Sequence, residues 1–147
     1  MKRDLDLVRQ LLLQIEALPA GPPAQYPTRE IEDPVLLAHF ELVIAAGLVN
    51  GNIARSQGAR GDVISISGLT WEGHEWIEMV RSQTVWNETK AALLESAGAM
   101  TYELTKDVAS KLLRARLAVS EGRLDSTPET AIVKRERAGW DSNPRDP

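Results

Sequence analysis

Apolar side chains recur at intervals of three and four residues in five segments of the chain, the spacing that places them on one face of an α-helix. The first segment is the clearest case, because Leu5, Val8 and Leu12 share a face that Ile15 extends. The later segments repeat the spacing with shorter stripes. The pattern therefore predicts helices over residues 3–18, 34–46, 71–81, 84–97 and 101–119.

Local signals mark several ends of these helices. Asp33 is a good N-cap residue, and the fixed φ of Pro34 suits the first helical position after it. Gly47 follows the second helix, where a glycine commonly ends one, and Thr70 is placed to cap the third. Gly73 lies inside the third helix and costs it stability, so we expect it to allow the close approach of another backbone.

Two short runs lie between the second and third predicted helices. Residues 48–54 and the β-branched run 63–66 predict strands, and the glycine-containing segment 55–61 predicts the tight reversal between them, a wing tip. A helix, a two-stranded ribbon and a new helix, in this order, are typical of the second half of a winged-helix domain. Such domains bind DNA most often and other proteins often, so the fold alone does not give the function.

The predicted fold class is mainly α with a small β-hairpin. A winged-helix-like domain is expected at residues 1–83, followed by two C-terminal helices at 84–119 that either pack back on it or form a dimer. The apolar pattern fails after residue 119, where glycine and proline interrupt a polar segment of mixed charge. Residues 120–147 are therefore expected to form a disordered tail.

A proline-rich segment separates the first two helices. Residues 19–27 contain four prolines and are expected to form a stiff, extended loop. Only a turn at Thr28–Ile31 fits where the first helix of a helix-turn-helix pair usually stands. That helix is therefore expected to be degenerate.

Charge argues against strong attraction to nucleic acid, which needs a basic face. The net charge is −4, and residues 1–83 carry 7 Lys and Arg against 11 Asp and Glu. The helix at 34–46 stands in the position of a recognition helix, where base-reading proteins present Arg, Lys, Asn or Gln. Its expected exposed side chains are instead His39 and Glu41, with carboxylates at its start on Glu30, Glu32 and Asp33.

Two functions remain open. The first is a winged-helix regulator that binds double-stranded DNA, favoured because the scaffold is so often used that way. The second is an acidic protein-protein interaction module, such as a phage-encoded modulator of a host protein or defence system. A homodimer through residues 84–119 would help the first, because two half-sites multiply affinity. The candidate contact residues are Arg55, Gln57, Arg60, Lys106, Lys111, Arg114 and Arg116.

Aromatic residues and one histidine supply candidate anchors for a partner. Trp71 and Trp76 are expected in the core or at a domain interface, because large aromatic side chains are mostly buried. The alternative is an exposed anchor, since tryptophan often dominates the energy of an interface. The candidate anchors are His39, Trp71 and Trp86.

The sequence carries no recognisable motif for catalysis or metal binding. It has no cysteine, which excludes disulfides and thiolate metal sites. Glu78 stands where a zinc-protease helix that starts at His74 would need a second histidine. We therefore expect no enzyme activity, no metal and no cofactor. No run is apolar enough to span a bilayer, and the first residues enter an amphipathic helix rather than a signal peptide, so a cytoplasmic location is expected.

Four strings carry a resemblance to a known family: Met1–Arg9, the block from His39 to Leu48, Leu69–Glu75 and Thr84–Asn87. Over roughly residues 1–117 the chain resembles an uncharacterised family of bacterial and prophage proteins, domain-of-unknown-function family 2513. The resemblance implies a winged-helix-like fold and occurrence in phage or mobile elements. It implies no activity and no site residues.

The end of the chain gives a separate indication of a mobile element. Trp140-Asp141-Ser142-Asn143-Pro144 can be encoded by DNA whose reverse complement matches the T-arm of a bacterial tRNA gene. Integrating elements favour such sites, so we hypothesise that the reading frame runs antisense into a tRNA gene. The alternative is a chance match of a short polar string, and different codons at these positions would remove the hypothesis.

Overall fold

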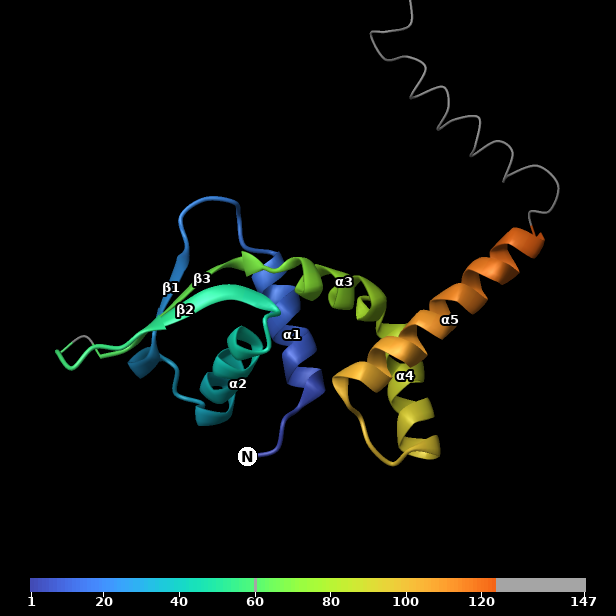
Figure 1. The fold of residues 1–147 in the computed structure, drawn as a ribbon, viewed down its shortest axis with the longest axis horizontal. Helices are drawn as coiled ribbons and strands as arrows, with labels where there is room; N and C mark the ends of the chain where they lie inside the picture. Colours follow the sequence, from blue (N-terminus) through green and yellow to red (C-terminus); the bar gives the residue numbers. More distant parts are fainter. Residues whose placement is uncertain (60, 124–147) are drawn as a thin grey trace, which may run out of the picture. The chain divides into compact units, whose positions relative to one another are not determined.

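The structure, a computed structural model, describes residues 1–59 and 61–123, with side chains described up to residue 119. The described residues divide into two units, one from Met1 to Ala109 and one that begins at Ser110, within α5. Within the described residues, no helix combines the length and the apolar character needed to cross a bilayer. The elements are α1 (Leu5–Glu16), β1 (Ala24–Pro27), a 3-10 turn η1 (Thr28–Glu30), α2 (Pro34–Ala45), β2 (Val49–Ala54), β3 (Val63–Leu69), α3 (Trp71–Val80), α4 (Gln83–Ser96) and α5 (Tyr102–Arg123) (Figure 1).

The sheet has three antiparallel strands in the order β1-β3-β2, so β3 is central (Figure 1). β2 and β3 form the predicted hairpin, paired from Val49 with Leu69 to Ala54 with Val63. This order of helices and strands, with the first strand beside the third, is winged-helix-like. The predicted fold class, mainly α with a small β-hairpin, is therefore confirmed.

The prediction of a stiff, extended loop at residues 19–27 is wrong at its end, because residues 24–27 form β1, which pairs with β3. β1 is an edge strand with one neighbour, so a proline that donates no hydrogen bond is tolerated at its last position, Pro27. The turn expected at Thr28–Ile31 is the 3-10 turn η1, and the first helix of the helix-turn-helix pair is indeed reduced to this turn.

The core of the first unit lies between α1, α3 and the sheet. Leu12, Ile64 and Ile77 are fully buried, and Trp76 packs edge-on against Trp86 with 5.9 Å between the ring centroids. The indole N–H of Trp76 donates to Thr105 Oγ1 at 3.2 Å. These contacts pack α4 and the first turns of α5 against the winged-helix elements. Helix α5 continues to Arg123, past its predicted end, and the tail expected beyond it lies outside the described residues.

Gly73 allows the close backbone approach that the sequence predicts. A Cβ atom at this position would collide with the carbonyl oxygen of Leu48, the residue that leads from α2 into β2. Thr70 holds the same junction: its hydroxyl donates to Gly47 O at 2.6 Å and accepts the N–H of Gly73 at 3.0 Å. The start of α3 is therefore fixed against the end of α2 through backbone contacts.

Arg9 is a buried cation on the otherwise apolar face of α1, with 3% of its surface exposed. Its Nε donates to Val80 O at 2.7 Å and its Nη2 to Arg81 O at 2.8 Å, so it caps the last carbonyls of α3. Its Nη1 donates to Gln83 Oε1 at 3.2 Å, at the start of α4. The guanidinium also lies 5.8 Å from the centre of the Trp86 ring. One side chain therefore joins α1, α3 and α4.

Replacing Gly73 with Ala should destabilise the protein severely, by more than about 3 kcal/mol, because the added methyl group meets a backbone carbonyl that cannot move alone. Urea unfolding followed by tryptophan fluorescence measures the change. Gly58→Ala is the matched control, since a Cβ there meets only the Ser56 hydroxyl at 3.6 Å. Equal stability of the two variants would contradict the close approach.

Replacing Arg9 with Met should cost about 2–4 kcal/mol of unfolding free energy, because it leaves buried acceptors on α3 without a donor. Arg9→Lys should lose almost as much, since one ammonium group lacks the planar fork of donors that the three acceptors require. Denaturant unfolding of both variants gives the answer. A loss below about 0.5 kcal/mol for Arg9→Met, the size of an ordinary surface substitution, would show that Arg9 does not hold the helices.

Candidate functional site

The outer side of α2 carries apolar side chains where a DNA-reading helix would carry polar ones. Only two of the twelve residues of α2 have polar side chains. Val35 and Leu42 are 41% and 36% exposed, and Ala38 and Ala45 lie on the same face at helical spacing. A helix that is apolar all round is normally buried all round. We call this surface, made of Val35, Ala38, Glu41, Leu42 and Ala45, the α2 face.

His39 is not on that face, and its prediction as an exposed partner anchor is wrong. The side chain is fully buried. Its Nε2 accepts the backbone N–H of Asp4 at 2.9 Å, and its Nδ1 lies 2.7 Å from Val35 O. Since Nε2 accepts, Nδ1 carries the proton and donates to Val35 O. The ring satisfies a backbone donor just ahead of α1, a partner 35 residues away that a helical wheel of α2 cannot reveal.

The wing arginine Arg55 is held by carboxylates. Its Nη1 donates to Asp62 Oδ2 at 2.9 Å, and its Nη2 lies 3.8 Å from Glu41 Oε1 on the α2 face. The hydrogen bond to Asp62 raises the pKa of Arg55. The backbone N–H of Ser56, and then Arg55, lower the pKa of Asp62. Both groups are therefore charged and face each other.

The remaining wing candidates differ in what the structure says of them. Gln57 is exposed at the wing tip, whereas Arg60 lies outside the described residues. Lys111, Arg114 and Arg116 are exposed residues of the second unit, on α5.

Lys106 is paired in the same manner as Arg55. Its Nζ lies 3.2 Å from Glu72 Oε1, which also accepts the Tyr102 hydroxyl at 2.7 Å. The hydrogen bond from Tyr102, followed by that from Lys106, lowers the pKa of Glu72. Burial, followed by the hydrogen bond to Glu72, raises the pKa of Tyr102. Arg55 and Lys106 thus belong to separate clusters and do not gather into one basic face.

The tryptophans divide differently from the expectation. Trp76 is buried as predicted. Trp86 is a candidate partner anchor in the sequence, and this prediction is wrong, because its side chain is 1% exposed and donates its indole N–H to Asp6 Oδ1 at 2.7 Å. Trp71 is 81% exposed, so its expected place in the core is also wrong. Two residues before the buried Gly73, it projects about 200° around the helix and away from the core. Of the three candidate anchors, Trp71 alone is available on the surface.

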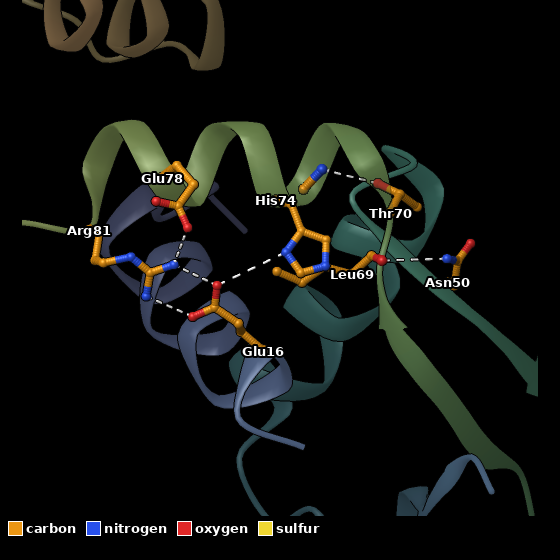
Figure 2. A network of polar contacts seen from close by, with 8 residues as sticks. Glu16, Asn50, Leu69, Thr70, His74, Glu78 and Arg81 are labelled. Atoms are coloured by element: carbon orange, nitrogen blue, oxygen red, sulfur yellow. Dashed lines mark hydrogen bonds and ion pairs between the residues drawn. The ribbon is translucent and has the colours of Figure 1, made fainter. Parts of the chain in front are cut away.

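A polar network links α1 to the outer side of α3 (Figure 2). Arg81 donates to both carboxylate oxygens of Glu16, at 2.7 and 2.6 Å, and to Glu78 Oε1 at 2.6 Å. His74 points toward the same group, with its Nδ1 4.0 Å from Glu16 Oε2 (Figure 2). The hydrogen bonds from Arg81 lower the pKa of Glu16.

This network has the character of a structural ion pair. A general acid or base works best with a pKa near the working pH, whereas each oxygen of Glu16 accepts a hydrogen bond from Arg81 and the pKa of Glu16 is lowered. Among the residues that the structure describes, no three His, Asp or Glu side chains gather as metal ligands. The arrangement fixes the end of α1 against α3.

Replacing Glu16 with Gln should lower the unfolding free energy at pH 7 by about 1 kcal/mol, since partly exposed ion pairs contribute little. The folded pKa of Glu16 lies below its ordinary value of 4.5. Its contribution is therefore present above that value and is lost as the pH falls through the folded pKa. Urea unfolding at several pH values should show the difference between wild type and Glu16→Gln shrinking below pH 4.5.

Glu95→Gln, at an exposed glutamate of α4, is the matched control and should match wild type at every pH. A constant difference between wild type and Glu16→Gln across the pH range would assign the effect to packing instead of charge.

The sequence of this chain matches other proteins and a protein family. The chain is 28% identical over 120 residues to an uncharacterised protein of Haemophilus influenzae, an alignment that covers 80% of this chain and the whole of that protein. No solved structure matches this chain. Residues 2–100, which span the winged-helix elements and α4, match the family described as "Hypothetical protein (DUF2513)". The chain belongs to this family, as its resemblance predicted.

Proposed function

We propose that this chain is a non-enzymatic protein-interaction module built on a winged-helix scaffold. The observation that carries the proposal is the engagement of Arg55, the described arginine of the wing, by Asp62 and by Glu41 of the α2 face. In a DNA-binding winged helix, the wing and the recognition helix supply cations and hydrogen-bond donors to one nucleic-acid surface. Here the helix in the recognition position, α2, supplies the carboxylate of Glu41, which lies 3.8 Å from the wing cation Arg55.

The charge of the whole region supports the same proposal. Residues 28–62, from η1 to the end of the wing, contain three arginines against five carboxylates. The carboxylates are Glu30, Glu32, Asp33, Glu41 and Asp62. Phosphate binding gains its free energy from cations that displace counterions, and each carboxylate nearby opposes it. The α2 and wing surface is therefore poorly suited to a DNA backbone.

The chemistry of the α2 face favours protein over bases. Val35 and Leu42 offer apolar area, and neither can read the donors and acceptors in a DNA groove. Exposed Trp71 adds a side chain of the type that anchors protein interfaces. A module carried by a mobile element, acting on a host protein, is the corresponding biological role. Its support is that residues 140–144, which lie outside the described residues, can be encoded by DNA whose reverse complement matches a tRNA T-arm.

The proposal predicts that labelled duplex DNA will not bind with salt-sensitive affinity. Fluorescence anisotropy at low and near-physiological salt should give a dissociation constant weaker than about 100 µM at the higher salt, beyond ordinary nonspecific binders. Steep loss of binding with salt, reduced by Arg55→Ala and Arg60→Ala, would overturn the proposal and restore the DNA-binding regulator.

Two double variants with reversed charges give this experiment a positive case and a matched control. Glu32→Lys with Glu41→Lys adds cations to the recognition position and should create salt-sensitive binding. Glu75→Lys with Glu95→Lys makes the same change of net charge at exposed positions on α3 and α4. The second pair should bind distinctly less than the first, because its cations lie on different helices away from the α2 face.

A further inference from the structure

We propose that the α2 face of one copy of this chain binds the helical segment 110–119 of α5 from a second copy. The inference deepens the proposed function by naming a partner for the α2 face. This inference rests on the proposed function, because it requires that the α2 face binds protein and not DNA.

The α2 face is an apolar surface with an acidic margin. Its stripe consists of Val35, Ala38, Leu42 and Ala45, which recur at three and four residues. Glu41 flanks the stripe, and its described ion-pair partner, Arg55, is 3.8 Å away. Glu32 and Asp33 are exposed just before the helix. The surface therefore suits a helix that presents apolar side chains between cations.

Segment 110–119 of α5 has this chemistry. It carries Lys111, Arg114 and Arg116, and it contains no carboxylate. Leu113 and Leu117 lie one turn apart on one face of the helix, and Leu117 and Val119 are 62% and 59% exposed. Because these apolar side chains are exposed, cover by a partner would remove them from water and stabilise the complex.

Charge selects this pairing over the two symmetric alternatives. Contact between two α2 faces would bring Glu41 and its neighbouring carboxylates together, and contact between two 110–119 segments would bring Lys111 and Arg114 together. Like charges placed across an interface are strongly disfavoured. Pairing the acidic face with the basic segment joins opposite charges and covers both apolar stripes. Two such contacts related by a two-fold axis give a closed dimer.

Sedimentation velocity of the full chain, across a wide range of protein concentrations and without DNA, tests the proposal. Wild type should form a dimer that dissociates on dilution. Glu32→Lys with Glu41→Lys, or Lys111→Glu with Arg114→Glu, should each raise the dissociation constant at least about tenfold. An equimolar mixture of the two double variants should restore the affinity, because each then meets the opposite charge on the other.

Apolar variants give a matched pair. Leu42→Gln on the α2 face should weaken the dimer about tenfold or more, whereas Leu94→Gln, at a 59% exposed leucine of α4, should leave it unchanged. The absence of cysteine allows a direct check of the contact. A short bifunctional maleimide should join Leu42→Cys to Leu117→Cys in a mixture far more efficiently than either variant to itself.

Three results would overturn the inference. Wild type that stays monomeric at every concentration removes the dimer. Loss of association in the α5 variant alone assigns the contact to a different surface. Mixed double variants that fail to associate rule out the opposite-charge pairing. Each can occur while DNA binding stays absent, so this inference can fail while the proposed function stands, and salt-sensitive DNA binding would fail the proposed function itself.

Discussion

The buried guanidinium of Arg9 holds the first unit together, because it is the point at which three helices share one set of hydrogen bonds. It fills the acceptors at the end of α3 and reaches Gln83 at the start of α4. Helix α1 also packs on α2 and β3. The hydrogen bonds of Arg9 therefore connect α3 and α4, through α1, to α2 and the sheet. A buried cation is tolerable here because its donors meet backbone carbonyls at the negative end of a helix.

The strings that identify the family meet one another in space. Asp4, from the first string, donates its N–H to His39 in the second. Gly73, in the third, packs on the backbone of Leu48, which ends the second. Asp6 accepts the indole N–H of Trp86 in the fourth, and despite the opposing effect of burial, the hydrogen bonds from Trp86 and Lys90 lower the pKa of Asp6. The strings that carry the resemblance therefore include residues that make contacts between elements of the fold.

The sequence predicts those features that depend on residues close together in the chain, and it does not predict those that depend on distant residues. The caps Asp33 and Thr70 act within three residues, so they are visible in the sequence and confirmed in the structure. The burial of His39 and Arg9 depends on partners 35 and 71 residues away, which no local pattern contains. The pairing of β1 depends on β3, about 40 residues away, and the four prolines of residues 19–27 argue against a strand unless it lies at the edge of a sheet.

The pairing of Arg55 with Glu41 has a consequence for how the α2 face chooses a partner. An exposed apolar stripe would associate with any hydrophobic surface, because the hydrophobic effect has no direction. Carboxylates along its margin penalise neutral and acidic partners, which leave them desolvated without a counter-charge, and so add the repulsive element that specificity needs. Arg55 donates to Asp62 and lies 3.8 Å from Glu41, so one cation is shared between two carboxylates and offsets their charge only in part. The protein partner that we propose would therefore bring its own cations, which a protein segment can carry and a nucleic-acid backbone does not.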